Sequence, residues 1–219
     1  MVNFDVSPFQ AFIFDMDGTL VDNMDFHRQT WIEWAPREGL NLSPEEILAQ
    51  THGTIGEIVA RFFPDKTSEE QFQIGERKEA LYRQIYAPHL ASLPGLKELL
   101  DWTKQQRMPC AVATAGNTHN INFTVDGLNI RSYFRAFVGG DDVTHGKPHP
   151  EVFLLAAQEL GIVPEKCLVF EDSPAGAQAA RRAGMKCIVL NMMSPREDFG
   201  EAPHVIEWAN DYRDLLHNS

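Results

Sequence analysis

Two aspartates stand one residue apart directly after a short apolar run near the N-terminus, in the sequence FIFDMDGTLVD. Buried side by side, the carboxylates of Asp15 and Asp17 would repel each other. Such a pair can instead divide the work of a reaction, with one acid acting as nucleophile and the other carrying a proton. Gly18 begins a turn that would let both side chains face one reacting atom. The spacing therefore favours catalysis over a solvated turn.

Other residues with suitable chemistry also follow apolar runs. Thr114 follows the second run, Glu171 and Asp172 follow the fourth, and Lys147 precedes a helical pattern. Ligands bind beyond the carboxyl ends of parallel strands, so these side chains should meet at one sheet edge. Asp15 and Asp172 can hold a hard cation such as Mg²⁺, and Lys147 and Thr114 can bind phosphate oxygens. This combination suits phosphoryl transfer.

The elements that must position these residues alternate between short apolar runs and helical patterns. The runs are expected to be parallel strands buried on both faces: Ala11–Phe14, Cys110–Ala113, Ala136–Val138, Cys167–Phe170 and Cys187–Leu190. Helices are expected at Pro94–Gln106, at Glu151–Leu160 and from Ser173 to Gly184. The alternation predicts an α/β fold with a Rossmann-like parallel-sheet core.

The segment after the first strand breaks this alternation. It contains no strong strand run and has helical patterns at Met24–Glu38, Pro44–Gln50, Gly56–Phe63 and Ser68–Tyr86. We expect residues 22–89 to form an inserted small α-helical cap domain, and residues 1–21 and 90–219 to form the catalytic core. A cap of this kind could close over the site and shape its specificity.

Composition excludes several broad classes of protein. The 219 residues are 43% apolar and carry a formal net charge of −12. A nucleic-acid or anionic-membrane binder needs a basic face, so neither partner is expected. No apolar stretch approaches the roughly 18 residues of a membrane span, and no signal-peptide pattern is visible. The odd number of cysteines indicates reduced thiols and therefore a cytoplasmic protein. We also expect a monomer that acts on a small phosphorylated substrate.

Four segments together resemble the motifs of the haloacid dehalogenase superfamily: DMDGTLVD, VATAGN, GKPHP and VFEDSPAGAQAARRAGM. They occur in the family's order, and the resemblance covers essentially the whole chain. The chain is most similar to the phosphatases related to β-phosphoglucomutase, which carry a helical cap after the first strand. The resemblance implies a Mg²⁺-dependent phosphatase that hydrolyses a small phosphorylated metabolite, a sugar or polyol phosphate, through an aspartyl-phosphate intermediate.

The resemblance also implies a catalytic or metal-binding role for each matching acid. Asp15 matches the nucleophile that becomes phosphorylated. Asp17 matches the general acid/base, and its backbone carbonyl matches a metal ligand. We expect its pKa to be raised so that it can carry a proton. Asp172 matches a magnesium carboxylate together with Asp15, and Glu171 matches a ligand that acts directly or through water.

Further matching positions concern phosphate and substrate. The resemblance implies phosphate binding by Thr114, Ala115 and Lys147. It suggests substrate contacts for His27, Gly53, Thr54 and Asn117. Among these, His27 lies on the first expected cap helix, where related sugar-phosphate enzymes carry a histidine that faces the site.

Alternative functions make different demands on the same residues. In the related mutases a cap arginine grips the second phosphate, but Gly56 occupies its place here and Arg61 lies a turn and a half later. β-Phosphoglucomutase is therefore the alternative rather than the first choice. A haloacid dehalogenase would need neither Asp17 nor a metal. A receiver-type phosphoacceptor would lack the cap, and a pure binding module would need neither nucleophile nor acid/base.

Overall fold

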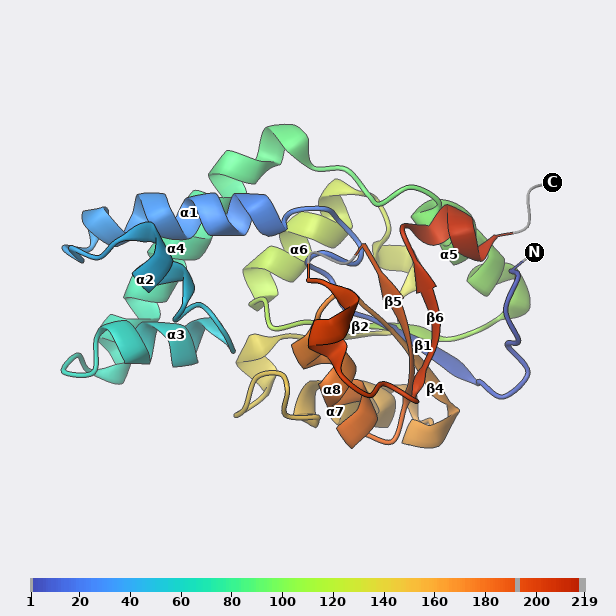
Figure 1. Ribbon diagram of the computed structural model, residues 1–219. Helices are drawn as coiled ribbons and strands as arrows, with labels where there is room; N and C mark the ends of the chain where they lie inside the picture. The colour runs from blue at the N-terminus through green and yellow to red at the C-terminus, as the bar shows by residue number, and fades with distance from the viewer. Residues whose placement is uncertain (1, 192–193, 217–219) are drawn as a thin grey trace.

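A parallel sheet of six strands forms the centre of the computed structural model, which describes residues 2–191 and 194–216 (Figure 1). The strand order is β3-β2-β1-β4-β5-β6, so the chain reverses direction across the sheet beside β1. The strands are β1 (Ala11–Phe14), β2 (Cys110–Ala113), β3 (Ala136–Val138), β4 (Cys167–Glu171), β5 (Lys186–Leu190) and β6 (Val205–Ala209). This order places β1 and β4 side by side at the centre.

Helices cover both faces of the sheet, which explains why its central strands are apolar throughout. Phe12 and Phe14 point to the face covered by α5 (Leu96–Gln106) and α6 (Thr118–Gly127). Ala11 and Ile13 point to the face covered by α7 (Glu151–Leu160) and α8 (Pro174–Arg182). The four residues of β1 are completely buried, so the strand is a fixed support for whatever follows it.

The helices α1 to α4 lie between β1 and β2 in sequence and form a separate lobe beside the sheet (Figure 1). Their bounds are Met24–Arg37, Pro44–Leu48, Ile55–Phe62 and Ser68–Tyr86. Trp34, Ile58 and Ile74 belong to a hydrophobic cluster of this lobe, distinct from the clusters on the sheet. Capping boxes begin α2, α3 and α4, with Ser43, Thr54 and Thr67 as the capping residues, which stabilises each helix start locally.

The expected α/β fold with an inserted helical region is confirmed, and the five expected strands are present. β6 and α6 were not predicted from the sequence. β6 is an edge strand in which Ile206 and Glu207 are both exposed, so it lacks the continuous apolar pattern of a central strand. The exact limits of the cap, residues 22–89, stay a prediction.

Two further expectations concern the cysteines and membranes. Cys110, Cys167 and Cys187 are free and buried, as reduced core thiols would be. Within the described residues, no helix combines the length and the apolar character that crossing a bilayer requires.

Candidate active site

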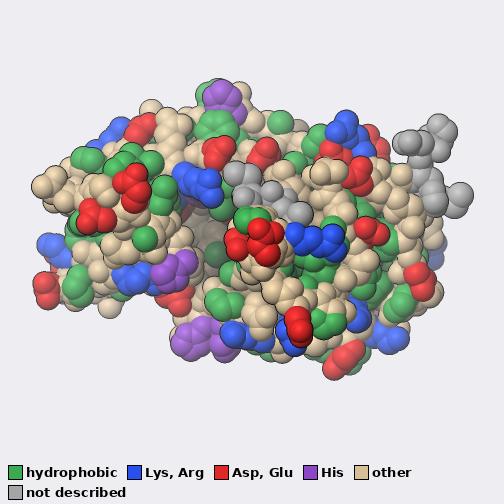
Figure 2. Space-filling view, in the orientation of Figure 1, with side chains coloured by type: hydrophobic (Ala, Val, Ile, Leu, Met, Phe, Trp, Pro, Cys, Tyr) green, Lys and Arg blue, Asp and Glu red, His purple; other side chains and the backbone are tan. Residues whose placement is uncertain are grey.

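The carboxyl end of β1 opens into a cavity of about 310 Å³ that is lined by residues of both the sheet and the cap. The molecular surface is hollowed where these two parts meet (Figure 2). Asp15 continues the strand pattern, because its backbone N–H donates to the carbonyl of Phe170 in β4. The residue is only 6% exposed. The nucleophile expected from the sequence therefore has a rigid support and lies at the bottom of a cavity.

The turn after Asp15 depends on Gly18, as the sequence suggested. Gly18 has a φ of +83°, a conformation that side chains of L-residues rarely adopt. A Cβ atom built there would lie 2.2 Å from Oδ2 of Asp172. The Gly18 N–H is shared between the carbonyl of Val21 and the side-chain oxygen of Asn23. This tight turn keeps both Asp15 and Asp17 on the cavity wall.

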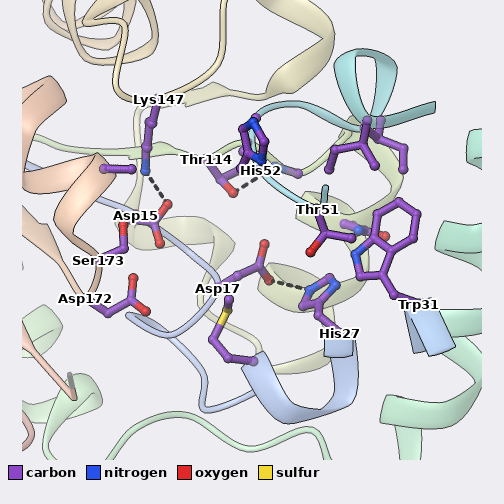
Figure 3. A pocket seen from close by; sticks show the side chains of 18 of the residues that line it. Asp15, Asp17, His27, Trp31, Thr51, His52, Thr114, Lys147, Asp172 and Ser173 are labelled. Carbon is purple, nitrogen blue, oxygen red and sulfur yellow. Dashed lines mark hydrogen bonds and ion pairs between the residues drawn. The ribbon is translucent and has the colours of Figure 1, made fainter. Parts of the chain in front are cut away.

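Lys147 points toward Asp15 at the sheet end of the cavity (Figure 3) and also contacts a second acid. Its Nζ donates to Oδ1 of Asp15 at 2.5 Å and to Oε1 of Glu171 at 2.7 Å. Burial lowers the pKa of Lys147, but the two carboxylates outweigh that effect and raise it above its ordinary value. The other Glu171 oxygen accepts from the backbone N–H groups of Asp172 and Ser173. Lys147 is therefore a fixed positive charge beside Asp15.

Three buried carboxylates form a group that could hold a metal ion. Asp15, Glu171 and Asp172 each offer a ligand atom within 4.8 Å of the others. Burial raises the pKa of Asp15 to about 7, although Lys147 opposes this rise. Burial also raises the pKa of Asp172 well above its ordinary value, and the charges of Glu171 and Asp15 add to the effect. These oxygens fit a hard divalent cation, which would offset their repulsion.

Asp17 lies on the cap side of Asp15 and has different neighbours. Its Oδ1 accepts a hydrogen bond of 2.6 Å from the amide of Asn23. Nε2 of His27 lies 3.4 Å from the same oxygen, close enough for attraction but without an aligned hydrogen bond. Burial raises the pKa of Asp17, but His27 and Asn23 outweigh that effect, so the pKa is lowered. The expectation of a raised pKa for Asp17 is wrong for this arrangement, because cap residues stabilise its ionised form.

Asn23 is a site residue that the sequence analysis missed. It is fully buried and bonds to Gly18, Asp17 and Tyr82. The expected junction between core and cap lies near this residue, but no role was predicted for its side chain. An asparagine immediately before a helical pattern was the available signal, but it indicates a helix cap. In the structure Asn23 occupies the cap position of α1 yet makes no side-chain capping bond.

The remaining candidate residues divide into two groups. Thr114, Ala115, His27 and Gly53 line the cavity with the acids and Lys147. The described lining does not include Thr54 or Asn117. The Thr54 hydroxyl accepts from the Glu57 N–H at the start of α3, and Thr54 lines a neighbouring cavity. The amide of Asn117 donates to Glu76 at 2.6 Å. Substrate contacts by either residue stay predictions.

The cap end of the cavity contains charged residues that were also missed. Lys78 and Glu79 of α4 line it together with Trp31 of α1 and Asn120 of α6. Lys78 and Glu79 are only 1% and 5% exposed. A sequence signal did exist, because Lys78 lies four residues from both Ile74 and Tyr82, which are buried on the same helix. A charged residue at such a position indicates a buried partner or a site.

Polar contacts connect the cap helix α4 to the core helix α6. Glu76 accepts from the amide of Asn117 and lies 2.8 Å from Nδ1 of His119. Further along α4, Glu79 accepts from the amide nitrogen of Asn120 at 2.6 Å, and Arg83 donates to its amide oxygen at 2.7 Å. These contacts join the cap to the core beside the cavity.

Comparison with known proteins gives the class to which this fold and site belong. The family model described as haloacid dehalogenase-like hydrolase matches residues 12–190, so the chain belongs to that family. Hexitol phosphatase A of Escherichia coli is 34% identical over 184 residues, which are 83% of each chain. Fructose-1-phosphate phosphatase YqaB of the same organism is 31% identical over 186 residues, 84% of this chain and 98% of the relative. The chain is thus a phosphatase of the haloacid dehalogenase-like family.

A solved structure supports the fold assignment. β-Phosphoglucomutase from Clostridium difficile superimposes with a TM-score of 0.79 and 24% sequence identity. The match covers 95% of this chain and 93% of that chain. At this identity the likeness establishes the sheet and its inserted helices, and the substrate has to be argued from the cavity itself.

Proposed function

We propose that the protein is a Mg²⁺-dependent phosphatase that hydrolyses a sugar or polyol monophosphate through an aspartyl phosphate on Asp15. The observation that carries this proposal is the convergence of Asp15, Asp172, Lys147 and Thr114 on one cavity that the cap also lines. The similarity to phosphatases named for hexitols and fructose 1-phosphate supports the substrate class.

The chemistry requires two displacements at phosphorus. In the first, a carboxylate oxygen of Asp15 attacks phosphorus, the bond to the substrate oxygen breaks, and Asp17 gives that oxygen a proton. In the second, Asp17 takes a proton from a water molecule. The water oxygen attacks phosphorus, and the bond to Asp15 breaks. Inorganic phosphate is released, and Asp15 and Asp17 return to their starting forms.

The environment of Asp17 suits both halves of this cycle. Its lowered pKa favours the ionised form, which can accept a proton from water. A bound phosphate monoester brings further negative charge close to Asp17 and opposes ionisation of the carboxyl. The substrate itself therefore favours the protonated form that the first displacement needs, and its departure favours the base.

The other residues hold the phosphoryl group in place. Lys147 provides a positive charge, and its 2.7 Å hydrogen bond to Glu171 holds its ammonium group in position. Thr114 offers a hydroxyl donor. Asp15 and Asp172 would hold a divalent cation, which would neutralise charge at the phosphoryl oxygens. The backbone carbonyl of Asp17 is the further proposed ligand. Both Glu171 oxygens already accept hydrogen bonds, which favours its action through water.

The mutase alternative needs a cation for a second phosphate, and the loop that should supply one does not. Gly56 stands in the expected place of the arginine, and Arg61 donates instead to the backbone carbonyls of Gln50 and His52. Among the described residues that line the cavity, the Lys and Arg side chains are Lys78 and Lys147. These observations favour the phosphatase.

Replacement of the nucleophile tests the proposal. Asp15→Asn should reduce turnover of p-nitrophenyl phosphate by about 1,000-fold or more, because the amide is a poor nucleophile. Its circular dichroism spectrum should match that of the wild type. Near wild-type turnover in this variant would show that the nucleophile is assigned wrongly.

A product assay separates phosphatase from mutase. The wild-type enzyme is incubated with β-glucose 1-phosphate and catalytic glucose bisphosphate. We expect free phosphate, whereas glucose 6-phosphate as the main product would establish the mutase instead.

A further inference from the structure

We propose that Glu79 determines substrate specificity by neutralising Lys78, so that the cavity selects phosphate monoesters whose remaining part carries no charge. This inference rests on the proposed phosphatase function and specifies its substrate class. Lys147 and the carboxylates of Asp15, Glu171 and Asp172 lie where the phosphate would bind. The rest of the substrate would therefore contact the cap end of the cavity, which must discriminate between substrates. Among the described residues that line the cavity, Lys78 and Lys147 are the Lys and Arg side chains, and Lys78 is the one at the cap end.

The ammonium group of Lys78 is already surrounded by partners. Nζ lies 2.9 Å from Oε1 of Glu79 and 3.2 Å from Nδ1 of His27, and it sits 4.4 Å from the centroid of the Trp31 ring. An ammonium group has three N–H donors, and each of the three can be directed at one of these neighbours. Little capacity remains to bind a second anion of the substrate.

Glu79 is held in place from the opposite side by the core. Its Oε2 accepts a 2.6 Å hydrogen bond from the amide of Asn120, and Oδ1 of Asn120 accepts from Arg83. Burial raises the pKa of Glu79, but Lys78 and His27 outweigh that effect and lower it. The carboxylate is thus ionised and cannot swing away from Lys78 without losing two buried bonds, which is costly.

The Lys78–Glu79 pair carries no net charge, and this has an electrostatic consequence for the substrate. A carboxylate or second phosphate would enter a largely buried space that offers no unpaired positive charge, and burying an uncompensated charge is costly. An uncharged polyol chain has no such cost. It would contact the Trp31 ring and the Thr51 hydroxyl, which lie on the same side of the cavity (Figure 3).

A matched pair of substrates tests this directly. Sorbitol 6-phosphate and 6-phosphogluconate share a six-carbon skeleton and differ in an uncharged or a carboxylate end. The wild-type kcat/KM should favour sorbitol 6-phosphate by at least about 10-fold. In Glu79→Gln the side chain keeps its shape and Lys78 is no longer neutralised. The ratio should therefore shift toward 6-phosphogluconate by about 10-fold or more.

Two control variants separate charge in the cavity from other effects. Glu69→Gln removes a negative charge from the exposed first turn of the same helix and should leave the ratio unchanged. The double variant Lys78→Met with Glu79→Gln removes both buried charges. Its ratio should return to within about threefold of the wild type. This variant keeps the test available should Glu79→Gln alone fail to fold, because a buried pair can be replaced by neutral residues more safely than halved.

The outcomes distinguish this inference from the proposed function. Hydrolysis of both substrates with the same ratio in wild type and Glu79→Gln would overturn the role of Glu79 and leave the phosphatase assignment intact. A wild-type preference for 6-phosphogluconate would also overturn it. Absence of phosphate release from either substrate and from p-nitrophenyl phosphate would contradict the proposed function itself.

Discussion

Asp15 and Asp17 are chemically identical, and the structure shows how their neighbours make them different. Asp15 contacts Lys147 and is one of the three buried carboxylates that could bind a metal. Asp17 contacts Asn23 and His27 instead. The residue types and their spacing predicted that both aspartates face one site, and both line the cavity; their catalytic roles stay predictions. The role of Asn23 could not be predicted, because it arises from the way the turn folds back to Gly18 and Asp17 and from a contact with Tyr82 of α4.

Loss of the Asn23 side chain should impair the proton carrier. Asn23→Ala should lower kcat by at least about 10-fold, since Asp17 loses its 2.6 Å hydrogen bond and its orientation. The unfolding free energy should fall by about 1–3 kcal/mol, because buried polar partners are left unsatisfied. Steady-state kinetics and urea denaturation measure the two effects.

A surface asparagine provides the control for this prediction. Asn122 bonds to Arg131 on the exposed side of α6, so Asn122→Ala should change stability by no more than about 0.5 kcal/mol. Equal kcat values for Asn23→Ala and the wild type would refute the positioning role of Asn23.

At the scale of elements, the close approach of α8 to the end of β4 fixes the acids. Gly176 lies in the first turn of α8, and a Cβ atom there would come within 1.7 Å of Oε1 of Glu171. That oxygen also accepts from Lys147, so the carboxylate has no room to move aside freely. The sequence predicted both elements and the start of α8. It could not reveal this contact, which depends on how closely the helix packs.

Gly176→Ala should therefore disturb the site more than an ordinary glycine replacement. We expect turnover to fall by at least about 10-fold and the unfolding free energy to drop by about 1–3 kcal/mol from overpacking. The matched control is Gly56→Ala in α3, where the nearest atom is 3.9 Å away. That change should stabilise the protein by up to about 1 kcal/mol. Equal stabilities for both variants would argue against the tight packing of α8.

The burial of each strand explains whether it could be predicted from the sequence. The central strands are buried on both faces, so their continuous apolar runs were visible. The edge strand β6 exposes Ile206 and Glu207 and carries no such pattern. The residues of the cap end, including Lys78 and Glu79, lie on a helix that was predicted, but their partners come from distant parts of the chain. Monomeric state and cytoplasmic location stay predictions.

For the whole molecule, metal binding should couple the site to stability. Asp15, Glu171 and Asp172 are buried close together, so a bound cation relieves repulsion in the folded state. Mg²⁺ at about 100 times its Kd should add about 2.7 kcal/mol, which raises Tm by several degrees in a protein of this size. EDTA should reverse the shift and stop turnover. Differential scanning fluorimetry and an activity assay measure both.

A ligand variant makes the metal prediction specific. Asp172→Asn should lose most of the Mg²⁺-dependent rise in Tm, because a carboxylate ligand is gone. A full rise in this variant, or turnover that EDTA leaves unaffected, would show that this group of acids is not the metal site.

The proposed mechanism requires phosphorylation of Asp15, and trapping the intermediate shows whether this occurs. In Asp17→Asn the second displacement lacks its base, while p-nitrophenyl phosphate has a leaving group that departs without a proton. We predict a burst of about one p-nitrophenolate per enzyme and, by mass spectrometry of the quenched protein, one phosphoryl group on Asp15. A phosphoryl group on another residue would contradict the account. So would an unmodified Asp15 with no burst in an enzyme whose wild-type form turns over.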